Sequence, residues 1–362
     1  PKKHTKYSMS IKKNYKIKSE KLEKFISTIY EKCKLSKKHA SIVAKGLVRA
    51  DVRGVWSHGV VRTPIYCQRI LKKVANPKPK IKIKKIQRNI LHVDGNNGLG
   101  FVTSDIAMNE CVKVAKKYGV GIAGIYNSNH FGMAANYLEI ATKNDCIAWV
   151  FTASSPALPP HGAMAAHFGT APFAFGSPTA NKNKPFILDM ACSAVARGKL
   201  KFAAKSGKKI PFGLALDKFG KPTNDGAKAF EGIMLPFGGM KGAGISWMMD
   251  IIGGIFTGAN HGGNIKNQFG NNFSGPANVG HFMICLKADL FQNKKQFLKK
   301  MEYGIKKVKK LKLAKNFKEI LHPGEPEYRK EQMIKKQGIV LSADIVKDLN
   351  ELGETLGVKS PF

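Results

Sequence analysis

The chain has 362 residues, of which 43% are hydrophobic and 36 are glycine. This length and composition exclude a disordered chain and predict a large core divided between two domains. The formal charge of +37, from 61 Lys and Arg against 24 Asp and Glu, would favour polyanionic partners. Because the lysines are spread without interleaved aromatic residues or zinc-finger spacing, we interpret them as a solvated surface and do not expect nucleic acid as a partner.

The six cysteines lie far apart and form no Cys-x-x-Cys motif. In a chain of this size they predict free thiols in a reducing compartment, with neither a zinc site nor a disulfide framework. We therefore expect a cytoplasmic location. Residues 1–17 are predicted to form a basic tail, and an organellar targeting role for this tail stays open.

The N-terminal region predicts helices. Ser36 is a plausible N-cap for a second helix, and a third runs through Ile65 and Ile70. The first helix shows apolar residues at helical spacing, namely Leu22, Phe25, Ile26 and Ile29. From about residue 78 the pattern changes to alternation in 81–83 and a strand at 90–94, followed by a turn at 95–100.

The middle of the chain alternates helices and strands. We predict a helix at 102–118, a strand at 120–125, a helix beginning near Met133, and strands at 146–152 and 186–190. A Gly-rich loop at 235–242 leads into an apolar helix at 245–256. Because the stretch at 242–259 contains Asp250 and several glycines, we interpret this helix as buried rather than membrane-spanning. A strand at 279–286 and a Lys-rich, mostly helical region from 291 complete the chain.

Two short segments place a histidine among polar residues flanked by glycine. Residues 56–62 read Trp-Ser-His-Gly-Val-Val-Arg, and residues 127–132 read Asn-Ser-Asn-His-Phe-Gly. Histidine can move a proton near neutral pH, and Arg62 can hold a carboxylate with two hydrogen bonds. Together they indicate chemistry on a small acid that carries a hydroxyl or oxo group, although a structural role for His58 and His130 stays open.

Other kinds of site find less support. No two histidines have metal-ligand spacing, so no metal site is predicted. A hydrolase could use Ser57 or Ser128, but the Gly-x-Ser-x-Gly elbow is missing. A Rossmann fingerprint and a P-loop are both absent. The glycine run at 238–244 opens a helix and carries Lys241, so it could hold a phosphate or be a plain tight turn.

A series of motifs from about residue 18 to residue 358 resembles the malate/L-lactate dehydrogenase family of the type that lacks a Rossmann fold. That family includes ureidoglycolate, sulfolactate and 2,3-diketogulonate-type dehydrogenases. In family order the motifs are Ala50-Asp51-Val52-Arg53-Gly54 with Ser57-His58-Gly59, residues 94–100 and 127–132, Ser154-Ser155-Pro156, Leu188-Asp189-Met190 followed by Ala196-Arg197-Gly198-Lys199, residues 235–242, and Pro323-Gly324-Glu325.

The resemblance implies an α/β, non-Rossmann NAD(P)-dependent oxidoreductase fold. Residues 18–77 with 242–358 would form a helical domain that binds substrate and dimerises. Residues 78–241 would form a mixed-sheet domain that binds the cofactor. The implied reaction is hydride transfer between NAD(P)(H) and a small 2-hydroxy or 2-oxo acid such as malate or lactate, in a homodimer.

The resemblance also implies roles for single residues. His130 would exchange the proton at the substrate oxygen, with His58 and Arg62 in the same catalytic pocket. Ser57 and Tyr66 would bind substrate. Cofactor contacts would come from Ser154, Leu188, Asp189, Met190 and Lys241. Asp189 at a strand end could accept a hydrogen bond from a ribose hydroxyl, which favours NAD over NADP.

Three positions depart from the family pattern, and they affect substrate choice more than reaction class. Trp56 stands where an acidic or polar residue is usual, Ala171 where Asn is common, and Met240 where His is frequent. The high positive charge is also unusual for the family. The alternative is a homologue that has lost catalysis and binds polyanions, although such a scaffold would not need to retain His58, Arg62 and His130.

Overall fold

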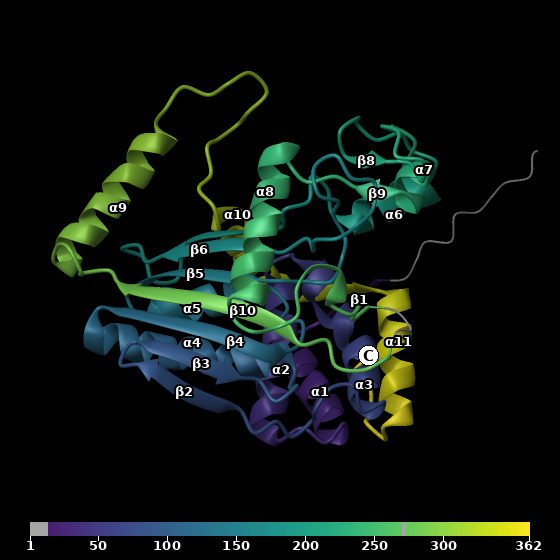
Figure 1. The fold of residues 1–362 in the computed structure, drawn as a ribbon, viewed down its shortest axis with the longest axis horizontal. Coiled ribbons are helices and arrows are strands. Elements are labelled where there is room, and N and C mark those ends of the chain that lie inside the picture. Colours follow the sequence, from purple (N-terminus) through teal and green to yellow (C-terminus); the bar gives the residue numbers. More distant parts are fainter. Residues whose placement is uncertain (1–13, 270–272) are drawn as a thin grey trace, which may run out of the picture.

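A computed structural model describes residues 14–269 and 273–362. Its centre is a seven-stranded mixed sheet with the order β2-β3-β4-β10-β5-β6-β7, in which β3 and β4 are parallel and the other neighbours are antiparallel (Figure 1). The strands are β2 (Lys82–Gln87), β3 (Ile90–Asp94), β4 (Val120–Ser128), β5 (Cys146–Thr152), β6 (Phe173–Ser177), β7 (Phe186–Met190) and β10 (Val279–Lys287). The predicted α/β class with a mixed sheet is confirmed.

Helices cover both faces of this sheet (Figure 1). The helices α4 (Gly100–Tyr118) and α5 (Ala135–Lys143) pack on one face, and α8 (Met240–Asp250) with the π-helical segment η3 (Ile251–Ile255) lies on the other. Glycines permit the helices to approach the strands closely. A Cβ at Gly121 would lie 2.3 Å from the carbonyl oxygen of Cys111 in α4, and one at Gly253 would lie 2.5 Å from a backbone nitrogen at the end of β5.

A helical unit unites the two ends of the chain. It contains α1 (Ser19–Lys32), α2 (Lys37–Val52), α3 (Thr63–Leu71), α10 (Glu325–Gln337) and α11 (Ala343–Thr355). One hydrophobic core joins α1, α2, α3, α10 and α11. The apolar spacing in α1 buries Leu22, Phe25, Ile26 and Ile29, and the predicted Ser36 cap accepts a hydrogen bond from the backbone of His39 at 3.2 Å. These two predictions are confirmed.

The remaining elements lie at the periphery. A small lobe contains α6 (Arg197–Lys205), β8 (Ala215–Leu216), α7 (Gly226–Glu231) and β9 (Ile233–Met234), and α9 (Lys294–Lys309) projects from the body (Figure 1). The short helices η1 (Trp56–His58), η2 (Val60–Arg62) and η4 (Gly262–Asn264) sit in loops.

Three sequence predictions need correction. The predicted tail of residues 1–17 extends too far, because β1 (Asn14–Ile17) pairs with β11 (Ile339–Ser342); residues 1–13 lie outside the described part. The predicted helical segment 242–358 supplies β10 to the middle of the sheet. The predicted buried helix at 245–256 carries exposed apolar side chains, because only one side of it meets the sheet: Trp247 is 55% exposed and Phe256 is 72% exposed. Strand β6 was not predicted.

The register of the sheet brings several strand ends to one edge. Ser128 at the end of β4 pairs with Val279 at the start of β10, and Thr152 at the end of β5 pairs with His281. Across β6, the end of β7 reaches the same edge, where Met190 pairs with Phe173. The helical unit packs against this edge, so a site can form between the sheet and the helices.

Candidate active site

The segment at 56–62 is held by a buried carboxylate. Asp51, in the last turn of α2, is 2% exposed and accepts a hydrogen bond from the backbone of Val60 at 2.8 Å. Burial raises the pKa of Asp51 to about 7. A Cβ at Gly59 would lie 2.0 Å from Oδ1 of Asp51, so only glycine fits there. The contact fixes the direction in which this segment presents His58 and Arg62.

The segment at 127–132 is held by three polar contacts after β4 ends. Asn127, the last residue but one of β4, has φ of +51°, at the point where the register with β10 is interrupted between Val279 and His281. The side chain of Asn129, 2% exposed, donates to the backbone carbonyls of Asn97 and Gly98 at 3.1 and 2.9 Å. The backbone N–H of His130 donates to Oε1 of Gln268 at 2.8 Å. The His130 backbone is thus fixed from both sides.

His281 supports the same segment from within the sheet. It is fully buried in β10, with Nδ1 2.7 Å from Oγ1 of Thr152 and Nε2 3.0 Å from Oγ of Ser128. Its ring stacks on Phe131 with centroids 4.7 Å apart. Burial lowers the pKa of His281 to about 3, so it is neutral at physiological pH. The structural role predicted for His281 agrees with these contacts.

Two hydrogen-bonding groups face Nδ1 of His130. The backbone N–H of Gly132 donates to Nδ1 of His130 at 3.2 Å, and the Tyr66 hydroxyl lies 2.7 Å from the same nitrogen. Without a proton, Nδ1 can accept from Gly132, and with a proton it can donate to the Tyr66 oxygen, so Nε2 is the nitrogen left for another partner. Tyr66 is 2% exposed and packs edge-on against Phe101, so its hydroxyl is held firmly beside His130.

The two predicted histidines lie together. The rings of His58 and His130 stack with centroids 5.7 Å apart, although the two segments come from different structural units. Nδ1 of His58 lies 2.9 Å from the Ser57 hydroxyl, which leaves its Nε2 for another partner.

Arg62 stands beside this pair. Its Nε donates to the backbone carbonyl of Ser57 at 2.8 Å, and its guanidinium lies 4.2 Å from the ring centroid of Phe269. No carboxylate of the described residues forms an ion pair with Arg62. Its terminal nitrogens can therefore bind a substrate carboxylate.

Both histidines are held neutral. Burial, followed by the charge of Arg62, lowers the pKa of His58 to about 4. Burial, with smaller contributions from His58, Arg62 and His281, lowers the pKa of His130 well below its usual value. A neutral imidazole near pH 7 can accept a proton from an alcohol, which is what the oxidation of a hydroxy acid needs.

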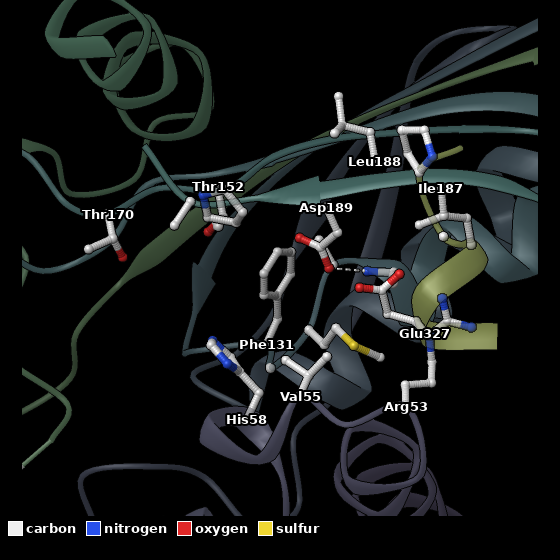
Figure 2. A pocket seen from close by; sticks show the side chains of 18 of the residues that line it. Arg53, Val55, His58, Phe131, Thr152, Thr170, Ile187, Leu188, Asp189 and Glu327 are labelled. Atoms are coloured by element: carbon white, nitrogen blue, oxygen red, sulfur yellow. Dashed lines mark hydrogen bonds between the residues drawn. The ribbon is translucent and has the colours of Figure 1, made fainter. Parts of the chain in front are cut away.

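His58 and His130 open into a cavity of about 560 Å³ (Figure 2). Figure 2 shows His58 beside Val55 and Phe131, with Asp189, Glu327 and Arg53 on the other side of Phe131. The far wall comes from β7 and from residues 321–324, and the near wall includes Thr152, Ser154 and Thr170. The cavity is mostly apolar with a few polar groups, as expected of a site for a cofactor and a small substrate.

The structure brings together most of the predicted site residues. His58, His130, Ser154, Leu188 and Asp189 line the cavity. Ser57, Arg62 and Tyr66 are not among its described lining residues but contact His58, His130 or each other. Met190 and Lys241 are also not among them, and Lys241 is exposed on the first turn of α8. The roles of all these residues remain predictions.

Some cavity residues were missed by the sequence reasoning. Gln268 gave no signal, because it lies in a loop far along the chain from His130. Arg53 belongs to one of the quoted motifs, and Glu327 lies just after another, so the motifs could have indicated both. Trp56 is 55% exposed with the Lys330 ammonium 5.5 Å from its ring centroid, and it is not among the described residues that line the cavity.

The described residues contain neither a cluster of metal-binding side chains nor a membrane-spanning helix. No three His, Cys, Asp or Glu side chains among them gather as a metal site would need. Within the same part of the chain, no helix has the length and apolar character needed to cross a membrane.

Comparisons with known proteins cover nearly the whole chain. The family model described as malate/L-lactate dehydrogenase matches residues 17–350. An L-sulfolactate dehydrogenase from Methanocaldococcus jannaschii is 37% identical over 342 residues, which is 94% of this chain and 97% of the relative. A malate dehydrogenase from Pyrococcus abyssi is 34% identical over 96% of this chain and 97% of its own. The solved sulfolactate dehydrogenase from M. jannaschii matches with a TM-score of 0.90 and 36% identity, covering 95% of this chain and 98% of that one.

Proposed function

This chain belongs to the malate/L-lactate dehydrogenase family, and we propose that its cavity transfers hydride between NAD(P)(H) and a small 2-hydroxy or 2-oxo acid. The observation that carries the proposal is the stacking of His58 on His130 at the end of the cavity, with the guanidinium of Arg62 beside them. The nicotinamide supplies the hydride chemistry when it is bound. The protein supplies the proton, the orientation of the acid and an environment with little water.

His130 is the proton carrier in this proposal. Loss of hydride from an alcohol carbon requires the hydroxyl proton to pass to a base, and the reverse reaction requires an acid at the same oxygen. Nε2 of His130 is the ring nitrogen that is left for substrate, since Nδ1 faces Tyr66 and Gly132. His58 narrows the same space, and Arg62 fixes the acid group so that the reacting carbon has one orientation.

Tyr66 acts through His130. To accept a proton at Nε2, the neutral ring must carry its own proton on Nδ1, and that proton needs an acceptor. The Tyr66 oxygen is an acceptor at 2.7 Å, whereas the Gly132 N–H is only a donor. Tyr66 is therefore a positioning residue that allows both tautomers of His130, rather than a substrate contact.

Tyr66→Phe is expected to lower kcat/KM about 10–100-fold in both directions, as the fixed equilibrium constant requires. It should also shift the acid limb of the pH profile to lower pH, because protonated His130 loses the acceptor for its Nδ1 proton. Steady-state kinetics across pH would measure both effects, with Tyr303→Phe, on exposed α9, as the matched control. An unchanged pH profile would show that Tyr66 only fills space.

The residues of the cavity fit a dinucleotide. The Ser154 hydroxyl, which accepts from the backbone of Ala171 at 3.3 Å, and the strand residues Leu188 and Asp189 line the part of the cavity beyond the histidines. We propose NAD as the preferred cofactor, because the Asp189 carboxylate suits a ribose hydroxyl better than a phosphate.

We also propose that residues 18–77 with 242–358 mainly serve substrate binding and dimerisation, and that 78–241 mainly bind cofactor. Met190 and Lys241 are carried as cofactor contacts on the family resemblance alone.

A homodimer is proposed for the outer face of α8 and η3. Exposed apolar side chains gather there, which is unusual for a surface that meets only water. They are Trp247, Met248, Ile251, Ile255 and Phe256. Sedimentation velocity across protein concentrations is expected to give a dimer, and a Trp247→Ser, Phe256→Ser double variant a monomer. A dimer that is unaffected by the double variant would place the contact elsewhere.

The reaction is tested by following NADH absorbance with malate, lactate, sulfolactate and ureidoglycolate, and with their oxo partners. Turnover of at least one pair is expected. The polyanion-binding alternative is not favoured, because His58, Arg62 and His130 remain together in one pocket. A protein without turnover or cofactor binding that bound nucleic acid at physiological salt would overturn the proposal.

A cytoplasmic location is also proposed, supported by six cysteines that are all free and buried.

A further inference from the structure

Gln268 is a buried carboxamide in the wall of the cavity. It lies in the loop before β10, is 3% exposed, and lines the same cavity as His58 and His130. Its Oε1 accepts a hydrogen bond from the backbone N–H of His130 at 2.8 Å. Because a backbone N–H can only donate, this contact fixes which end of the amide is the oxygen and leaves Nε2 at the other end.

The Nε2 group of Gln268 is a donor that waits for an acceptor. The hydrogen bond through Oε1 is the one contact of this amide with the described residues. Nε2 is not among the fully enclosed polar atoms that lack a partner, so it keeps access to the cavity. A donor in a mostly apolar wall is unfavourable until an acceptor reaches it. This point of the cavity therefore suits an acceptor atom of a ligand.

The contacts of residues 268 and 269 lie on the substrate side of the cavity. Gln268 holds the backbone of His130, and the Phe269 ring packs edge-on against the His130 ring with centroids 5.0 Å apart. The guanidinium of Arg62 lies 4.2 Å from the centroid of the same Phe269 ring. One pair of adjacent residues thus contacts both the proposed proton carrier and the proposed carboxylate-binding residue. An acid held between His130 and Arg62 would bring the oxygen on its C2 carbon to this wall.

The reacting oxygen needs a donor that neighbouring side chains do not supply. Negative charge builds on this oxygen as hydride reaches a 2-oxo acid, and fixed donors in a site with little water stabilise that charge. Arg62 is engaged by the carboxylate in the proposed function. Thr152 donates to a backbone carbonyl at 2.8 Å, and Arg53 donates to Glu139 at 3.0 Å. The amide of Gln268 has no such commitment and stays uncharged at every working pH.

We propose that Nε2 of Gln268 is a catalytic hydrogen-bond donor to the C2 oxygen of the substrate, beside Nε2 of His130. The proposal rests on the proposed dehydrogenase function and assigns a second residue to its chemical step. Gln268 neither gains nor loses a proton. Hydride is exchanged at C2, the proton passes through His130, and the amide holds the oxygen while its charge changes.

The test uses full-length Gln268→Glu and Gln268→Met. Glutamate keeps an oxygen for the His130 N–H and replaces the donor with an acceptor, whereas methionine removes both groups. In each variant kcat for reduction of the 2-oxo acid is expected to fall about 10²–10³-fold, and the dissociation constant for NADH to change less than 3-fold. Gln296→Glu, exposed on α9, makes the same chemical change far from the cavity and should behave as the unmodified protein.

A pair of ligands identifies the atom that the amide meets. Oxidation of the hydroxy acid is inhibited with its 2-oxo product and with the matching acid whose C2 carries two hydrogens in place of the oxygen. The ratio of the inhibition constant of the 2-deoxy acid to that of the 2-oxo acid is expected to fall at least 5-fold in both variants. Repulsion between the new glutamate and the substrate carboxylate weakens both acids alike, so repulsion alone leaves the ratio unchanged.

The outcomes separate this inference from the proposed function. A ratio that is unchanged in Gln268→Glu would overturn the inference, and a loss confined to Gln268→Met would reduce Gln268 to a support for the His130 backbone. A dissociation constant for NADH that rises more than 3-fold in Gln268→Glu would move the donor to the cofactor and would also overturn it. An unmodified protein that binds no NADH and turns over no acid would overturn the proposed function instead.

Discussion

His130→Gln is expected to lower kcat about 10³–10⁴-fold while the dissociation constant for NADH changes less than 3-fold. General acid–base catalysis by a positioned side chain contributes about 10²–10⁴-fold, and glutamine at this position cannot exchange a proton. The side chain is held between Tyr66 and Phe269, and glutamine retains much of its volume there. The loss therefore falls on the chemical step rather than on the fold.

Steady-state turnover and equilibrium NADH binding, measured on the same preparation, would check this. His161→Gln, in an exposed loop, is the matched control and should behave as the unmodified protein. The pH profile gives a second readout. Because burial lowers the pKa of His130 below 6.5, oxidation of a hydroxy acid should be independent of pH near neutrality and fall only in acid. A variant that kept full turnover would exclude His130 as the proton carrier.

The secondary structure could be predicted from the sequence where a residue pattern fits only one kind of element. The apolar spacing of α1 and the Ser36 cap each require a helix, and the alternation before the turn at 95–100 requires strands. The sequence did not show in the same way which side of the helix at 245–256 is buried. Its apolar residues cover the whole circumference of the helix, so the sequence alone does not show that one side packs on the sheet and Trp247 faces outward.

The site was predictable in its residue types but not in its contacts. The glycine-flanked segments indicated His58, Arg62 and His130, and the stacking of the two histidines agrees with a shared pocket. No sequence pattern could show that Tyr66 bonds to His130 or that Gln268 holds its backbone, because these pairs come from elements distant along the chain. The packing of the helical unit against the sheet edge brings Tyr66 to His130, and the loop before β10 brings Gln268 there.

Arg62→Gln is expected to lower kcat/KM about 10²–10³-fold, mainly by raising KM. A bidentate arginine–carboxylate pair in a site with little water is worth several charge-assisted hydrogen bonds, about 3–4 kcal/mol. Glutamine can offer one neutral donor in place of the planar guanidinium and cannot stack on Phe269 with a charge. Arg62→Lys should recover only part of the loss, because an ammonium keeps the charge without the bidentate geometry.

The substrate itself supplies the decisive comparison for Arg62. The unmodified protein should prefer an acid to its carboxamide by a large factor, and Arg62→Gln should reduce this preference to near unity by slowing the acid alone. Arg88→Gln, exposed after β2, removes the same charge far from the cavity and should leave the preference intact. Because Nε of Arg62 also holds the backbone of Ser57, the variant could displace His58. Displacement would slow the acid and the carboxamide alike and preserve the preference, and that result would contradict carboxylate binding by Arg62.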